Sequence, residues 1–206
     1  SKIPHLEWSG PLFYTMEGSL ESPENIIIRV KHLILMDIGS QGHTEFVHDI
    51  DKMMDVYDQF PEADPTSDKS EGWKIGLIHS HNTMATFFSG EDDEELVDNT
   101  EGVGFYLSLV VNNKRERTAC LAHELTEQIK SVTKRTFFGI KTPISIEEEE
   151  EITSINKIML DVIDEVPEFK ELDERILELD EIRKKNNVAK YPRTHHYTPP
   201  GRNHQQ

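Results

Sequence analysis

The chain has 206 residues, and its acidic residues outnumber the basic ones by 39 to 22, for a formal net charge of −17 at pH 7. This balance disfavours nucleic acid as a partner, because phosphates are neutralised by clustered lysine and arginine. No apolar run approaches the ~20 residues that span a bilayer, and we expect neither a signal peptide nor a membrane partner. Cys120 is the only cysteine, which excludes an intrachain disulfide. We therefore expect an acidic, soluble, cytoplasmic protein.

The first 142 residues mix apolar alternation with turn signals and predict an α/β domain (α+β in stricter usage). β-branched and aromatic residues at 10–16 and 25–38, with a polar turn between them, predict two antiparallel strands. Apolar residues recur every three or four positions over 46–60, which is typical of an amphipathic helix. The other predicted elements are a loop at 61–72, strands at 73–78, 105–111, 117–121 and 132–140, and a helix at 89–99. The expected fold is a mixed, largely antiparallel sheet flanked by helices.

The remaining residues differ in composition from this domain. Residues 143–187 are strongly acidic, and two apolar stripes predict one helix over 147–166 and another beyond Pro167. Residues 188–206 form a polar tail that carries basic residues and no acidic ones. The predicted organisation is a domain at 1–142, an acidic helical extension at 143–187 and a basic tail at 188–206. The extension and the tail are candidate surfaces for an oligomer or a larger assembly.

The most informative stretch lies between residues 79 and 92. His79 and His81 are two residues apart at the end of a predicted strand, so both imidazoles leave one face of the sheet. If Ser89 caps the next helix, Asp92 falls in its first turn, where its carboxylate can point back toward the strand. Two imidazoles and a carboxylate suit a zinc ion with a fourth position open for water. The histidine pair and the Ser-x-x-acid segment each have a structural explanation when taken alone: two histidines on a strand can be ordinary hydrogen-bonded residues, and Ser-x-x-acid is a capping box. The spacing of the two segments together favours a metal site.

The sequence HSHNTMATFFSGED resembles the signature of the JAB1/MPN/Mov34 zinc metalloenzymes (JAMM or MPN+ domains): His-x-His, seven residues, then Ser-x-x-Asp. The resemblance implies that His79, His81 and Asp92 bind one zinc ion per chain. It also implies that Ser89 positions water or stabilises the oxyanion of the tetrahedral intermediate. The implied fold is the JAMM/MPN-like, cytidine-deaminase-like sheet with flanking helices.

The same family carries a glutamate near the start of its domain, in a Glu-x-x-Gly-x-Leu context. The sequence EWSGPL, which begins at Glu7, matches this context and implies that Glu7 is the general acid/base; Glu17 and Glu45 are competing candidates. Many family members have proline after the second histidine, where this chain has Asn82. The opening EWSGPLFY is more similar to bacterial and viral (phage-like) members, for which the location would be the host cytoplasm.

We therefore expect a zinc-dependent metallopeptidase or isopeptidase that hydrolyses an amide bond of a protein or peptide. Family resemblance implies ubiquitin-like conjugates as one substrate class. The main alternative is a non-catalytic structural or interaction protein that keeps this fold and assembles through its extension and tail. A zinc hydrolase that acts on a non-peptide amide is a third hypothesis, and only substrate profiling distinguishes it from the peptidase or isopeptidase.

Overall fold

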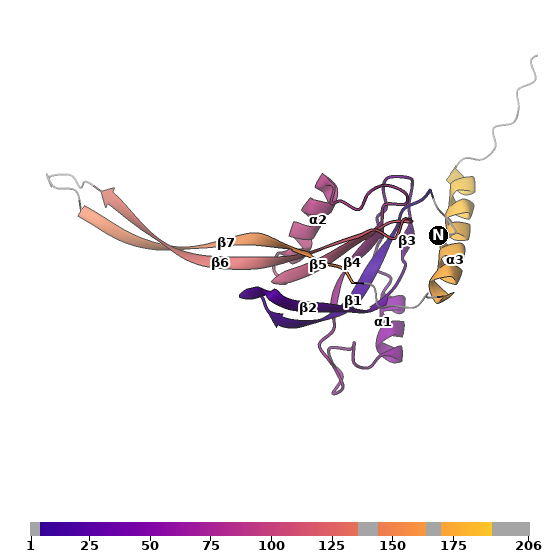
Figure 1. Ribbon diagram of the computed structural model, residues 1–206, viewed down its shortest axis with the longest axis horizontal. Coiled ribbons are helices and arrows are strands. Elements are labelled where there is room, and N and C mark those ends of the chain that lie inside the picture. Colours follow the sequence, from indigo (N-terminus) through magenta and orange to yellow (C-terminus); the bar gives the residue numbers. More distant parts are fainter. Residues whose placement is uncertain (1–4, 136–143, 164–169, 191–206) are drawn as a thin grey trace, which may run out of the picture.

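The computed structural model describes residues 5–135, 144–163 and 170–190, and it confirms the expected mixed α/β architecture (Figure 1). The described strands form one mostly antiparallel sheet in the order β2-β1-β4-β5-β6-β7, in which only the β4–β5 pair is parallel, and β3 pairs with β1. The strands are β1 (Trp8–Ser19), β2 (Ser22–Leu33), β3 (Asp37–Ile38), β4 (Lys74–Ser80), β5 (Phe105–Val111), β6 (Arg117–Arg135) and β7 (Ile144–Leu160). The helices are α1 (Ile50–Gln59), α2 (Gly90–Thr100) and α3 (Lys170–Lys190).

Helices α1 and α2 cover the same face of the sheet. Directly paired residues point to one face, and the register joins Phe13 to Ile75, Leu77 to Ser108 and Ser108 to Cys120. Phe13 packs against buried residues of α1 and the loop that follows it, whereas Cys120 packs against α2. The predicted site lies on this face of the sheet, over β1 and β4.

The opposite face holds the main apolar cluster, and α3 packs at one end of the sheet. Five residues of this cluster are at most 4% exposed: Leu12, Tyr14, Ile78, Leu107 and Leu121. Helix α3 packs Ile176 and Leu179 against Leu35 and Ile38, and the Arg175 Nε donates a hydrogen bond to the Leu35 carbonyl at 3.2 Å. The predicted second helix of the extension is thus present. Among the described residues, no helix is long and apolar enough to cross a membrane.

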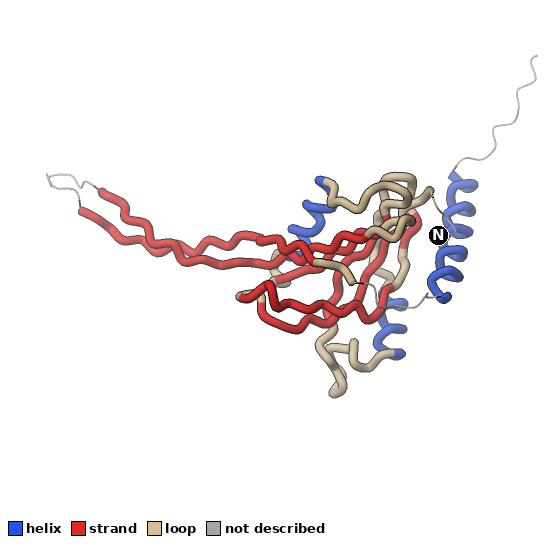
Figure 2. The backbone as a smooth tube through the Cα atoms, in the orientation of Figure 1, coloured by secondary structure: helices blue, strands red, loops and turns tan. Residues whose placement is uncertain are grey.

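Two predicted elements of the C-terminal half need correction. The helix expected over 147–166 is wrong over 147–160, which belong to the strand β7; this strand pairs with β6 from Ala119–Leu160 to Arg135–Ile144 (Figure 2). The strand expected at 132–140 is confirmed over 132–135, but as the end of β6 and not as a separate strand, and residues 136–140 lie outside the described residues. A strand at this position gains a full ladder of hydrogen bonds to β6, which a local apolar stripe does not report. The predicted tail from residue 191 onward lies outside the described residues.

Candidate metal centre

Strand β4 delivers both histidines to the face that α1 and α2 cover. His79 is paired with Ser9 of β1, and His81 follows the strand directly, held by its backbone N–H, which donates to the Val111 carbonyl at 2.9 Å. The side chains of a strand alternate between faces, so residues two apart emerge together. Both histidines are nearly removed from solvent, at 4% and 6% exposure. The predicted alignment of the two imidazoles is therefore present.

The N-terminus of α2 brings the carboxylate to them. Ser89 is the N-cap, and its Oγ accepts a hydrogen bond from the Asp92 N–H at 3.2 Å while the Asp92 Oδ2 accepts one from the Ser89 N–H at 2.7 Å. The capping box and the candidate metal site are thus not alternatives, because the capping box orients the same carboxylate that faces the histidines. Leu96 fixes the helix by packing against Cys120 and Ala122 of β6.

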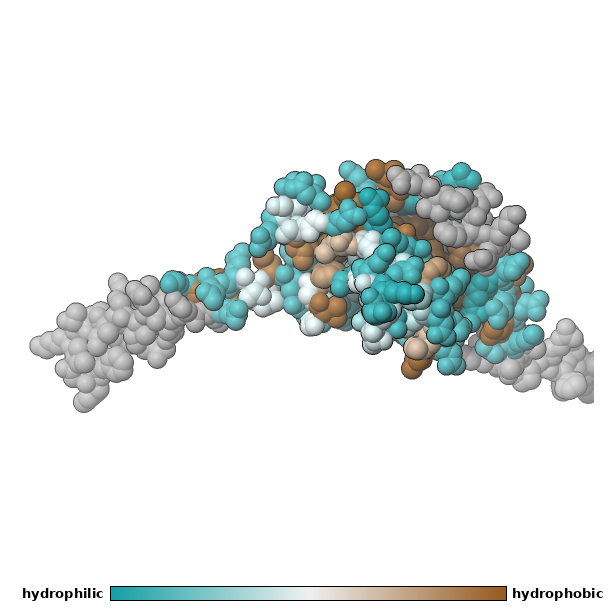
Figure 3. All heavy atoms as spheres, turned by 90° about the horizontal axis from the view of Figure 1, so that it is seen from below, coloured by the Kyte–Doolittle hydropathy of each residue, from teal (hydrophilic) through white to brown (hydrophobic). Residues whose placement is uncertain are grey.

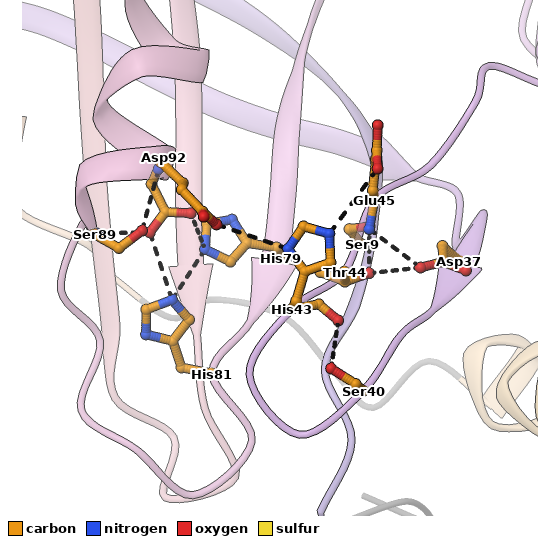
Figure 4. A network of polar contacts seen from close by, with 11 residues as sticks. Ser9, Asp37, Ser40, His43, Thr44, Glu45, His79, His81, Ser89 and Asp92 are labelled. Atoms are coloured by element: carbon orange, nitrogen blue, oxygen red, sulfur yellow. Dashed lines mark hydrogen bonds and ion pairs between the residues drawn. The ribbon is translucent and has the colours of Figure 1, made fainter.

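The three candidate ligands converge on one point, as Figure 4 shows. The His79 Nε2 lies 3.1 Å from the His81 Nε2 and 3.1 Å from the Asp92 Oδ1, and the His81 Nε2 lies 3.7 Å from the Asp92 Oδ2. Zinc–ligand bonds of about 2.0–2.1 Å in a tetrahedron place neighbouring ligand atoms about 3.3 Å apart. The three side chains therefore lie at distances at which they could hold one metal ion.

The environment keeps the ligands in the forms that a metal ion needs. The Nδ1 of His81 lies 2.9 Å from the Ala85 carbonyl, and an N–H donated there leaves the Nε2 lone pair for a metal. Burial alone would raise the pKa of Asp92, but the hydrogen bond and charge of His79 and the hydrogen bonds from Ser89 lower it overall. The carboxylate is therefore ionised at neutral pH.

Glu7 lies beside this group and directly precedes β1. It precedes Ser9, the partner of His79, by two residues and so emerges on the same face; its side chain is buried at 4% exposure. Its backbone is fixed by two hydrogen bonds to the segment after β3. Burial raises the pKa of Glu7, although the nearby His81 and His79 act in the opposite direction. A carboxyl group with a raised pKa is suited to accept and release a proton near neutral pH.

Gly10 explains why the Glu-x-x-Gly sequence is needed for this placement. A Cβ atom at residue 10 would lie 1.9 Å from the Ile34 carbonyl oxygen, so only glycine permits this close approach. The contact belongs to the same run of pairing in which the Met36 N–H donates to the Ser9 carbonyl. The glycine thus lets β1 lie directly against the segment that follows β2, which positions Glu7 and Ser9.

The two competing glutamates occupy different places. Glu17 lies eight residues beyond Ser9, about 26 Å along the strand, and forms an exposed ion pair with Arg29 at 3.3 Å. Glu45 lies closer, in the wall of the cavity that contains His79, and its carboxylate is 3.9 Å from His43. The structure therefore separates Glu17 from the histidines, and it places Glu7 and Glu45 near them.

The loop between β3 and α1 completes the site, and sequence reasoning did not assign it a role. The Ser9 Oγ lies 2.8 Å from the Thr44 Oγ1, which donates to the Asp37 Oδ2 at 2.9 Å (Figure 4). His43 lies 3.7 Å from Glu91 of α2, on the other side of the cavity. These contacts tie the loop to both walls. Nothing in the sequence pattern signals them, because the partners lie far apart in the chain.

Asn82 is a second residue whose role the sequence did not reveal. Its φ of 40° lies in the left-handed region, which asparagine tolerates and which proline, with φ fixed near −65°, cannot adopt. Its side-chain amide donates to the Gln41 carbonyl at 2.7 Å, and its own carbonyl accepts from the Asn113 N–H at 2.7 Å. Asn82 thus joins two loops beside the histidines, in a backbone conformation that proline could not adopt.

Sequence comparisons add no relative to this description. No family model matches the chain, and no curated protein matches it at a significant level.

Proposed function

We propose that this protein is a zinc-dependent hydrolase of peptide or isopeptide bonds, of the kind that its resemblance to JAMM domains implies. The observation that carries the proposal is the convergence of His79, His81 and Asp92 beside a second, buried carboxyl group, Glu7. Hydrolysis of an amide needs both a Lewis acid and a group that takes and returns a proton. The proposed centre supplies three ligands for the first and Glu7 for the second.

Each residue has one task in the proposed reaction. When bound, zinc would supply Lewis acidity that lowers the pKa of water and polarises the substrate carbonyl. Glu7 takes the proton from the attacking water and delivers it to the nitrogen of the departing amine, so that the C–N bond breaks as the C–O bond persists. Ser89 accepts a hydrogen bond in the helix cap, so its O–H remains available to donate to the developing oxyanion.

Substitution of Glu7 tests the proposal most directly. The Glu7→Gln protein should retain one zinc ion per chain, measured by elemental mass spectrometry, and lose amide hydrolysis by about 10²–10⁴-fold. Glu17→Gln is the matched control, because it makes the same change within β1, away from the histidines. The assay uses unmodified peptides, lysine isopeptides and ubiquitin dimers. Chelator-insensitive cleavage, or no cleavage by the zinc-loaded wild type, would contradict the proposal.

A role in assembly is the second candidate, and the β6–β7 ribbon favours it. Beyond β5 these two strands leave the body as a projecting arm (Figure 1), and three of its apolar side chains are 41–44% exposed: Leu125, Ile129 and Ile152. Two strands without a further layer are marginally stable in water, so such an arm gains from a partner. Sedimentation of the wild type and of Leu125→Ser/Ile129→Ser tests this, since a shift in mass only for the wild type supports assembly.

A further inference from the structure

The face between α1 and α2 is hollowed into two adjoining cavities. The first, of about 500 Å³, is lined by His79 and Asp92 of the proposed metal centre, with Ser9 and Leu77 beside His79 on its floor. The second, of about 390 Å³, has Phe13 and Ile75 on its floor. Both cavities are lined by Asn99 of α2, and their floor residues follow one another along β1 and β4. The two cavities therefore adjoin at Asn99 and follow each other along the sheet from the metal centre, and together they are called the groove below.

The walls of the first cavity are strongly acidic. The lining residues include two histidines, His43 and His79, but neither lysine nor arginine. Besides Asp92, five acidic residues line the cavity: Glu45, Glu91, Glu94, Glu95 and Asp98. Glu94 and Asp98 are exposed, lie four residues apart on α2 and so face the same side of that helix. Carboxylates gathered around a concave surface attract cations more strongly than the same charges spread over a convex one.

The second cavity has the opposite character. Six aromatic residues line it: Phe13, Tyr14, Tyr57, Trp73, Phe105 and Tyr106. The buried hydroxyl of Tyr14 has no hydrogen-bond partner among the described residues. A buried polar atom without a partner is costly, and the aromatic lining favours a bulky apolar group. The cavity therefore suits an aromatic or large aliphatic side chain.

From these features we infer that the groove selects an extended, cationic polypeptide segment with a bulky apolar residue at a fixed distance from the bond that is cut. This inference rests on the proposed hydrolase function and names its substrate class. Strand β4 covers four residues between His79 and Ile75, about 13 Å. An extended substrate beside it spans the same length, so lysine or arginine lies next to the scissile amide and the apolar residue about four positions away, on one side only.

A positional series of quenched fluorescent peptides tests the substrate class. Lysine, serine or glutamate flanks the scissile amide, and a single phenylalanine is moved from two to six residues away on either side. We expect lysine to exceed glutamate in kcat/KM by about tenfold, and one optimum for phenylalanine near four residues. Cleavage that is indifferent to both changes would overturn the inference.

Two variants assign these preferences to the two cavities. Glu94→Lys/Asp98→Lys should abolish or reverse the preference for lysine, whereas Asp51→Lys/Asp58→Lys, which makes the same charge change on the exposed surface of α1, should not. Val103→Trp fills the aromatic cavity from an exposed position and should remove the phenylalanine optimum; Val47→Trp, at an exposed residue outside both cavities, is its control. Variants that behave like their controls would contradict the assignment.

Binding separates failure of this inference from failure of the proposed function. Fluorescence anisotropy of the same peptides with the Glu7→Gln protein reports occupancy of the groove without hydrolysis. Binding that depends on lysine and phenylalanine, with no cleavage by the wild type, would support the inferred substrate class and contradict the hydrolase function. Cleavage without either preference would support the hydrolase function and contradict the inferred substrate class. The absence of both binding and cleavage would contradict both.

Discussion

Strand β6 passes through two regions of the molecule. It pairs with β7 in both, but the two regions differ in their other strand neighbour and in the burial of their side chains. Up to His123 it lies between β5 and β7, and Leu121 is fully buried in the main apolar cluster. From Leu125 onward it pairs with β7 alone, and Leu125 is 41% exposed. In the space-filling view, the coloured part of the ribbon next to the body is much narrower than the body (Figure 3). One strand thus belongs both to a packed body and to a free ribbon.

The contrast shows where this chain can hold a reactive arrangement. The proposed centre draws its side chains from β1, β4 and α2, which are packed by apolar clusters on both faces of the sheet. Its ligands are therefore held in place before any metal arrives, as a catalytic site requires. In the ribbon, β6 and β7 are paired by hydrogen bonds, but the described apolar side chains Leu125, Ile129 and Ile152 are 41–44% exposed, so it is suited to contact a partner and unsuited to precise chemistry.

The largest expected effect comes from removing a side chain in the packed part of β6. Leu121→Ala should lower the free energy of unfolding by about 2–5 kcal/mol, because it leaves a cavity among fully buried neighbours. Urea denaturation followed by circular dichroism measures this loss. Leu125→Ala, four residues along the same strand, is the matched control. Equal losses for the two variants would contradict the distinction between body and ribbon.

Zinc should raise the free energy of unfolding through its ligands in the body, and a substitution in the ribbon should not change this effect. Free zinc at one hundred times its Kd raises the free energy of unfolding by about 2.7 kcal/mol if it binds only the folded protein. Thermal unfolding with zinc and with a chelator measures this difference. His81→Ala should abolish it and Thr126→Ala, in the ribbon, should leave it unchanged. A zinc response that survives His81→Ala would place the ion elsewhere.

The pH dependence of stability should expose the cost of burying Glu7. Because its pKa is raised in the folded protein, folding favours its protonated form, so stability falls as pH rises from the unfolded value of 4.5 through the folded one. Without metal, Glu7→Gln should therefore be more stable than the wild type at pH 7, by about 1.4 kcal/mol per unit of raised pKa, and should lose this advantage below pH about 4.5. Denaturation at several pH values checks this, with Glu17→Gln as the control that shows no such advantage.

The double role of Ser89 leads to a smaller effect. Ser89→Ala removes the cap of α2 and should cost about 1 kcal/mol of stability. It should also weaken zinc binding, because the cap orients Asp92. Ser89→Thr keeps a hydroxyl in the same place and should restore both properties, which calorimetric zinc titration can measure. A Ser89→Ala protein with unchanged stability would mean that the capping box contributes little.

Sequence patterns predicted those elements whose local signal agrees with their packing. The strand at 105–111 and the helix that begins after Ser89 lie where the sequence placed them. The candidate ligands could be predicted as a group because they fall within 14 residues, on one strand and the helix that follows it. The contacts of Thr44 and Asn82 could not, since they join loops whose partners are set by the whole fold.

The strand β7 shows why the other elements were missed. Ile152, Ile155 and Met159 fall at helical spacing, and the glutamate run before them consists of good helix formers, so the local evidence points to a helix. Pairing with β6 makes this segment a strand instead. A short stretch of sequence that contains only one strand of a pair does not reveal which strand it pairs with. The same pairing extends β6 through residues that the sequence assigned to a separate strand.

The smallest expected effect belongs to the ribbon itself. Ile129→Thr removes an apolar side chain that is 41% exposed and keeps the β-branched shape that suits a strand, so stability of the isolated chain should change by at most about 0.5 kcal/mol. Hydrogen exchange should likewise show weaker protection at Ile129 than at Leu121, since opening the ribbon need not disturb the core. Strong protection at both positions, or a large loss of stability, would mean that the ribbon is packed against something in solution. Because Thr preserves the backbone preference, such a result would be attributable to lost contacts and would make self-association through the ribbon the next quantity to measure.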